Sequence, residues 1–234
     1  MSRTKKLRRF IVIVIFIVSV SQLNAQETPV QLLQGVRDKL VKVQDYSADV
    51  QIKADIPLIK ILPVNAEIFF KQPDKLKLVS KSIAIMPRQG FGDYVKIVGD
   101  STTYTAFSTG FETIEKLNTE IISVIPSVDT GDLILAKFWI DASDHLIVKS
   151  QLTSRTNGTM TVSYSYGAMA KFGLPDIIIF MVDMKKFKIP KMLTSNPYSD
   201  DKKGTEKATS SKKGIIEIKL TNYKINPGLE DSFF

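Results

Sequence analysis

The sequence predicts a mainly β protein of the α+β class. Most of the chain after residue 25 consists of short segments in which apolar and polar residues alternate, as in strands with one dry face. Turn-forming residues separate these segments, and Asn157-Gly158 between two alternating runs is a strong hairpin signal. Residues 28–44 instead repeat their apolar residues at helical spacing, which adds one amphipathic helix before the first strand.

That helix has a clear start signal. Thr28 suits the N-cap, Pro29 the first helical position, and Gln31 the position from which a side chain reaches back in a capping box. The expected helix ends near Gln44, and its apolar face consists of Leu32, Leu33, Val36, Leu40 and Val43.

The strands are predicted from period-two alternation and from turn residues. The clearest ones span residues 47–56, 64–71, 75–80, 133–140, 145–154, 159–166, 177–184 and 214–223. A further hairpin is expected from residues 94–98 and 101–107, with Gly99-Asp100 at its tip. Residues 114–125 have apolar residues at mixed helical spacing and predict a short helix. Residues 195–213 are polar and predict a flexible insertion.

Residues 1–25 have the order of a secretory signal peptide. Five Lys and Arg residues precede an apolar run from Phe10 to Val20, and Leu23-Asn24-Ala25 follows. As a membrane anchor this run is too short, because about 1.5 Å per residue covers only about half of a bilayer's hydrocarbon core. We expect cleavage after Ala25 and export to the periplasm of a Gram-negative type envelope, with residues 26–234 forming a single domain.

The net charge and the absence of cysteine exclude or disfavour several classes of function. The formal charge of +8 includes five basic residues of the signal peptide, so about +3 remains on the mature chain, which gives little reason to expect a nucleic-acid partner. The chain has no cysteine, which excludes disulfides, thiolate metal sites, a cysteine nucleophile and the acylated cysteine of a lipoprotein. We expect a monomer without cofactor or metal.

Four regions of the sequence resemble the LolA-type outer-membrane lipoprotein carriers and related lipoprotein-sorting proteins. The leading helix and a strand opening with Tyr46-Ser47-Ala48 precede an aromatic strand and proline turn, residues 68–78. Later patterns are Phe138-Trp139-Ile140-Asp141, Gly173-Leu174-Pro175-Asp176 and the tail from Tyr223 to Phe233. The resemblance covers nearly the whole mature chain and depends on order and spacing, because no single motif is specific.

The resemblance implies a curved, unclosed antiparallel β-barrel, or half-barrel, with short lid helices on its concave face and a hydrophobic cavity between them. Either this cavity or an ordinary core accounts for the dry strand faces, and with the resemblance we expect a cavity. The residues expected to line it are Val50, Ile52, Ile68, Phe70, Leu78, Trp139, Ile179 and Met181.

Control of the lid is the point where the sequence departs from the family. LolA has an arginine before the turn proline that helps to hold the lid, and Gln72 stands at that position here. Gly90 and Gly92 around Phe91 are candidates for a lid hinge, although glycine in a loop commonly serves only the turn.

The polar candidates for chemistry have simpler interpretations. His145 beside Asp144 suggests a catalytic pair. However, His145 is the only histidine of the chain, and we interpret it as a residue of a turn without a catalytic role. Asp141 and Asp144 bracket the same turn without the spacing of a calcium loop. The lysines of residues 202–213 are interpreted as a solvated loop, with contact to a membrane surface or a partner as the alternative.

These observations predict a non-enzymatic periplasmic carrier that sequesters the acyl chains of lipoproteins or other lipids for transfer towards the outer membrane. The resemblance implies lipoprotein or lipid cargo, an inner-membrane release complex and an outer-membrane acceptor as partners. The alternative is an RseB-like envelope sensor or interaction module that uses the same fold to bind lipid or a regulatory partner, although such sensors carry a second domain. An enzyme would need a polar constellation that the sequence does not reveal.

Overall fold

The computed structural model describes residues 27–56, 59–81, 97–127, 132–156, 158–183 and 213–234. The expected signal peptide, the hinge candidates Gly90, Phe91 and Gly92, and residues 195–212 of the expected insertion lie outside these ranges. Within the described residues, no helix is long and apolar enough to cross a membrane.

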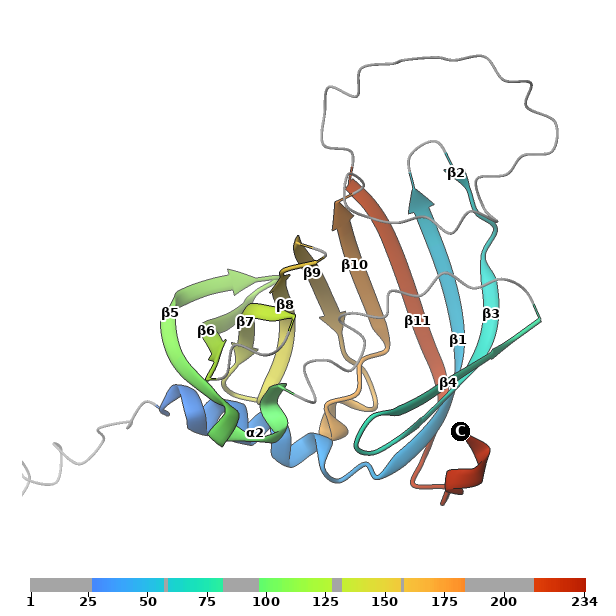
Figure 1. The fold of residues 1–234 in the computed structure, drawn as a ribbon, viewed down its shortest axis with the longest axis horizontal. Helices are drawn as coiled ribbons and strands as arrows, with labels where there is room; N and C mark the ends of the chain where they lie inside the picture. The colour runs from blue at the N-terminus through green and yellow to red at the C-terminus, as the bar shows by residue number, and fades with distance from the viewer. Residues whose placement is uncertain (1–26, 57–58, 82–96, 128–131, 157, 184–212) are drawn as a thin grey trace, which may run out of the picture.

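The dominant element is an eleven-stranded antiparallel sheet with the order β4-β3-β1-β11-β10-β9-β8-β7-β6-β5, to which β2 is added by pairing with β1 (Figure 1). The strands are β1 Asp45–Ile56, β2 Ile59–Lys60, β3 Val64–Lys71, β4 Lys75–Ser80, β5 Tyr104–Ile114, β6 Leu117–Pro126, β7 Leu133–Asp141, β8 Leu146–Ser154, β9 Gly158–Ser165, β10 Ile177–Asp183 and β11 Lys213–Ile225.

The sheet is strongly curved but does not close on itself. Strands β4 and β5 form the two ends of the path and do not pair with each other in the part of the chain that the structure describes. Figure 1 shows the strands wrapping from β5 to β3 around one concave side. The predicted fold class, an unclosed antiparallel half-barrel with a short helix, is confirmed.

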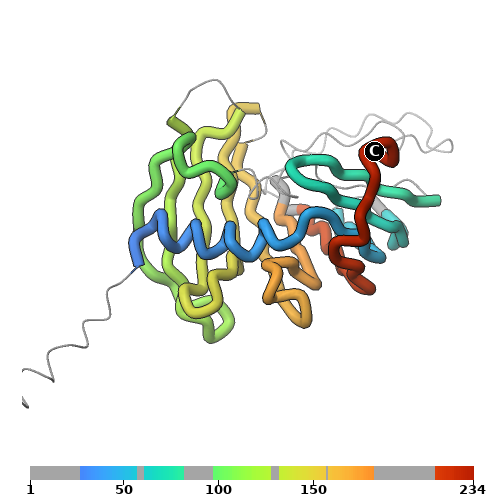
Figure 2. The backbone as a smooth tube through the Cα atoms, turned by 90° about the horizontal axis from the view of Figure 1, so that it is seen from below, coloured from blue at the N-terminus to red at the C-terminus, as the bar shows by residue number. Residues whose placement is uncertain are grey.

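The helix α2, Pro29–Leu40, runs across the strands at one end of the sheet (Figures 1 and 2). It begins as predicted, because the Thr28 side chain accepts a hydrogen bond from the Gln31 backbone N–H and the Gln31 side chain accepts one from the Thr28 backbone N–H. It ends before the expected Gln44. Its apolar face packs towards β5 and the short 3-10 helix η2, Ala170–Phe172.

Two sequence-based predictions are wrong. The expected strand ending at Val98 is helical over residues 97–99, and Asp100 does not form a hairpin tip. Its carboxylate accepts the Thr102 backbone N–H and caps the 3-10 helix η1, Ser101–Thr103, which leads into β5.

Residues 114–125, expected to be a helix, belong to the β5–β6 hairpin. Glu115 and Lys116 form its turn with positive φ values of 47° and 77°, a backbone geometry that usually selects glycine or asparagine. The isoleucines that follow are β-branched and stiff, which suits the pleated strand β6 better than a helix.

Candidate ligand-binding face

The concave face of the sheet is lined by cross-strand rows of buried apolar side chains. Because strand side chains alternate between faces, each row is fixed by the register of neighbouring strands. One row comprises Ile122, Phe138, Ser150, Val162, Phe180 and Ile216. A second comprises Tyr164, Ile178, Ile218, Ile52 and Val64.

The helix α2 packs into the same apolar cluster. Leu32, Leu33, Val36 and Leu40 are buried and belong to the cluster formed by the concave face of the sheet. Each fully buried side chain of this size contributes about 1.5–3 kcal/mol relative to exposure. The helix is therefore held on the concave face by its own core contacts.

Five of the predicted cavity residues lie on this face. Val50, Ile52 and Ile68 belong to the cluster, and Phe70 and Leu78 pack against it while partly buried. The structure therefore brings these five together, whereas their role in ligand binding stays a prediction.

The other three, Trp139, Ile179 and Met181, lie on the opposite face of the sheet. Trp139 pairs with Lys149, and Ile179 pairs with Glu217, in a row of mixed character that contains Ile121, Trp139, Lys149, Ser163, Ile179, Glu217 and Lys53. The prediction that these three residues lie on the concave face is therefore wrong. These strands have apolar residues at both odd and even positions, so the sequence pattern does not show which side chains point to the concave face.

Trp139 has polar and charged neighbours on that convex face. Its indole N–H donates to the Glu112 carboxylate, and the Lys149 ammonium lies 4.1 Å from the centroid of the Trp139 ring. The same ammonium lies 3.6 Å from Glu112 Oε1. This cluster stabilises the outside of the β5–β8 region through a cation–π contact and an ion pair.

Gln72 fastens the C-terminal end of α2. Its side-chain amide Nε2 donates to the backbone oxygens of Leu40 at 3.2 Å and Val43 at 2.7 Å. The Gln72 backbone N–H also donates to Gln44 O at 2.8 Å. The residue therefore supplies hydrogen-bond donors to carbonyl groups at and after the helix end, and a role at the helix is compatible with its predicted position beside the lid.

Asn226, for which the sequence predicted no role of its own, holds the next part of this connection. Its Oδ1 accepts the Gln44 backbone N–H at 2.7 Å, and its Nδ2 donates to Lys42 O at 3.0 Å. Asn226 has a φ of 53°, in the left-handed region that asparagine tolerates better than most residues. The Asn-Pro-Gly sequence at 226–228 was the available signal for such a special turn.

The C-terminal tail docks on the convex side of β3 and β4. Asp231 lies 2.8 Å from Lys71 Nζ and 3.0 Å from Lys75 Nζ. Hydrogen bonds from Lys71, and then from Lys75, hold the pKa of Asp231 below its ordinary value. The Phe69 and Phe233 rings meet edge to face with centroids 4.7 Å apart, which makes Phe69 an outward neighbour of the inward Phe70.

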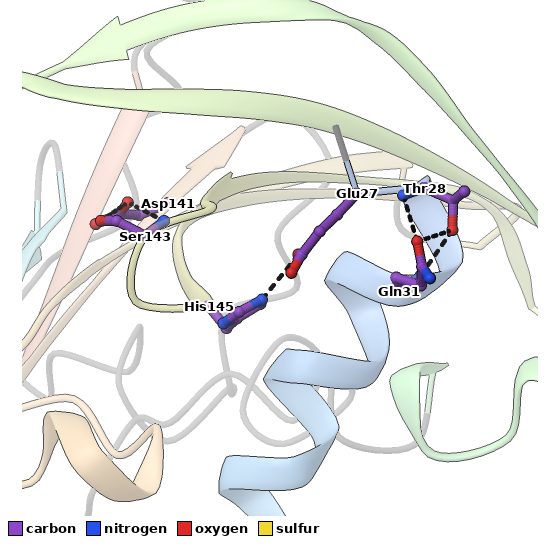
Figure 3. Close-up of polar contacts among 6 residues, drawn as sticks. All are labelled: Glu27, Thr28, Gln31, Asp141, Ser143 and His145. Atoms are coloured by element: carbon purple, nitrogen blue, oxygen red, sulfur yellow. Dashed lines mark hydrogen bonds and ion pairs between the residues drawn. The ribbon is translucent and has the colours of Figure 1, made fainter. Parts of the chain in front are cut away.

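The polar candidates for chemistry serve local structure. His145 Nε2 lies 2.9 Å from Glu27 Oε2, and Asp141 Oδ1 accepts hydrogen bonds from the backbone N–H and hydroxyl of Ser143 (Figure 3). The His145 ring also occupies the space beside Gly35 of α2. His145 thereby links Glu27, which precedes the N-cap of α2, and the middle of the helix to the β7–β8 turn.

Comparison with solved structures identifies the fold. The chain is similar to a LolA superfamily protein from Nitrosomonas europaea, with 12% identity and a TM-score of 0.54 over 89% of this chain and 98% of that one. A DUF1329 family protein from Desulfovibrio piger gives 11% identity and a TM-score of 0.54 over the same shares. A putative outer membrane lipoprotein-sorting protein domain from Vibrio parahaemolyticus gives 9% identity and a TM-score of 0.52 over 87% of this chain and 94% of that one.

No family model and no curated protein matches the sequence. The structural likeness, at such low identity, shows the fold: the chain has a LolA-like architecture, as its sequence resemblance predicted.

Proposed function

We propose that this protein is a non-enzymatic periplasmic carrier that holds the acyl chains of a lipoprotein or another lipid against the concave face of its sheet. The observation that carries the proposal is the continuous cluster of apolar side chains that the cross-strand rows form together with α2. The LolA-like fold and the expected signal peptide support it.

The energetics of acyl transfer favour such a surface. Moving an acyl chain through water costs about 0.8 kcal/mol for each exposed CH₂ group, so a carrier needs extensive apolar area and no chemical step. Phe70 and Leu78 are only partly buried at the edge of the apolar cluster, where a ligand chain would find accessible apolar surface.

Within this proposal, α2 stays packed on the sheet when a ligand binds and does not move away as a lid would. The residue before its N-cap, Glu27, is linked to the sheet through His145, and the connection after its C-terminal end is held by Gln72 and Asn226. Detaching it would also expose its four buried leucine and valine side chains to water. An acyl chain would therefore insert alongside α2 while the helix stays in place.

The transport steps follow the expected export. Cleavage after Ala25 would release the carrier into the periplasm, where it would receive lipidated cargo from an inner-membrane release complex and deliver it to an outer-membrane acceptor. Native mass spectrometry of the protein purified gently from the periplasm measures both features, because the mass of the free chain reports the cleavage site and adducts report bound lipid.

Two adjacent phenylalanines offer a matched test of the binding face. Phe70 packs against the concave cluster, whereas Phe69 contacts Phe233 on the convex side. We expect Phe70→Glu to weaken binding of a fluorescent fatty acid on the order of tenfold or more, since the ligand chain would meet a charge. Phe69→Glu should bind the probe as the wild type does.

Circular dichroism of both variants separates binding from folding. Loss of probe binding in a folded Phe70→Glu, with binding retained in Phe69→Glu, supports the proposal. A wild-type protein that takes up no acyl probe contradicts it, and so does equal binding by both variants.

A further inference from the structure

A pocket lies where three segments meet at the C-terminal end of α2. The last turn of the helix, the β3–β4 turn and residues 98–100 enclose a volume of about 460 Å³. This volume falls within the range of about 300–1,000 Å³ that is typical of small-molecule sites.

The floor and the rim of this pocket differ in character. Leu40 and Val98 line it from below and are buried members of the apolar cluster on the concave face. Arg37, Asp74 and Asp100 line it while exposed to solvent. The pocket therefore joins a charged rim directly to the surface that we propose binds acyl chains.

Arg37 and Asp100 on the rim carry opposite charges that do not form an ion pair with each other. Among the described residues, neither Arg37 nor Asp100 forms an ion pair, although the Arg37 charge contributes to lowering the pKa of Asp100. Hydrogen bonds from the Thr102 side chain and backbone make the larger contribution to that lowered pKa, so Asp100 is ionised at neutral pH. An arginine guanidinium carries a positive charge in proteins.

One buried hydroxyl group has no hydrogen-bond partner among the described residues. It belongs to Tyr104, whose side chain is part of the apolar cluster and only 8% exposed. Tyr104 directly follows the 3-10 helix η1, which Asp100 caps, so the residue begins next to the rim. Burial raises the pKa of its hydroxyl. A buried donor without a partner is costly, and an oxygen atom of a ligand would satisfy it.

We propose that this pocket binds the zwitterionic headgroup of a glycerophospholipid, with the phosphate at Arg37, the ammonium at Asp100 and an ester oxygen accepting from the Tyr104 hydroxyl. The inference rests on the proposed carrier function, because the acyl chain of the same lipid would continue past Leu40 and Val98 onto the concave face. Asp100 disfavours a headgroup of purely negative charge, and the negative end of the α2 dipole has the same effect.

The test compares ligands that share one acyl chain. Palmitoyl lysophosphatidylethanolamine, palmitoyl lysophosphatidylglycerol and palmitate would each compete with a fluorescent fatty acid for the mature protein. We expect the zwitterionic lipid to compete on the order of tenfold more strongly than the anionic lysolipid. Asp100→Asn, which keeps an acceptor for Thr102, should remove this preference.

Three further variants resolve the contacts. Arg37→Gln should weaken both lysolipids, whereas Lys42→Gln, a matched loss of charge at an exposed residue that does not line the pocket, should leave both unchanged. Tyr104→Phe removes only the hydroxyl, so it should weaken the two ester-bearing ligands and leave palmitate unaffected.

The outcomes for this inference and for the carrier function are distinguishable. If the probe binds but the two lysolipids compete equally, or if the anionic lysolipid competes better, the headgroup site is overturned and the carrier function stands. If the probe does not bind, both are overturned.

Discussion

Replacement of Gln72 by alanine tests how the end of α2 is held. The change removes the hydrogen bonds from Nε2 to Leu40 O and to Val43 O, of 3.2 Å and 2.7 Å. Leu40 O keeps the Val43 backbone N–H as a donor, so the larger loss falls on Val43 O. With a net value of about 0.5–1.5 kcal/mol for each hydrogen bond, we expect the free energy of unfolding to fall by about 1–2 kcal/mol.

Urea denaturation followed by circular dichroism measures this loss, with the slope of the transition unchanged. Gln72→Arg restores a donor and places a positive charge near the C-terminal end of the helix, so its stability should lie close to that of the wild type. Gln51→Ala is the matched control, because it removes an exposed amide with a single 3.3 Å bond to Asn65. If Gln72→Ala costs no more than Gln51→Ala, the side chain does not hold the helix.

Two further predictions concern contacts outside the binding face. Gly35→Ala should destabilise the protein, because the new Cβ would lie 2.1 Å from His145 Cδ2. In a His145→Ala background the same change should stabilise the protein by about 0.5–1 kcal/mol through helix propensity. Thermal unfolding of the four proteins measures both effects, and equal effects in the two backgrounds would exclude the clash. The lowered pKa of Asp231 means that its ion pairs with Lys71 and Lys75 are fully present above the ordinary value of 3.8 and are lost as the pH falls through the lower folded value. An NMR titration should therefore give an Asp231 midpoint below 3.8 that rises in Lys71→Gln, and a midpoint at or above 3.8 in the wild type would refute the contact.

The sequence predicted those elements whose local signals agreed with their tertiary environment. The bounds of β3 and β4 match the predicted strands at residues 64–71 and 75–80, since alternation and the proline turn at Gln72-Pro73 coincide there. The start of α2 was equally clear because Thr28 and Gln31 cap it locally.

The errors arose where a local signal had two interpretations. The spacing of apolar residues from Ile114 to Ile125 suits a helix, and the turn at Glu115-Lys116 contains no glycine or asparagine that would have revealed the hairpin. Gly99-Asp100 suggested a strand turn, but an aspartate that is suited to a hairpin tip is equally suited to cap a helical turn.

The candidate site was predictable only in part. Alternation placed Val50, Ile52 and Ile68 on one face, but Trp139 and Ile179 lie in strands that are apolar at both parities, so their facing depended on the register of the whole sheet. The pocket at the end of α2 joins three segments of the sequence, with Arg37 and Asp100 more than 60 residues apart, and no local pattern relates them.

Photo-crosslinking with a diazirine-bearing fatty acid tests the central claim most directly. After saturable labelling of the mature protein, peptide mass spectrometry would locate the modified residues. We predict labels on the concave face, at positions such as Val50, Ile68 and Phe70, and none at the convex Trp139 or Ile179. Labels concentrated on the convex face, or labelling that does not saturate, would contradict the account.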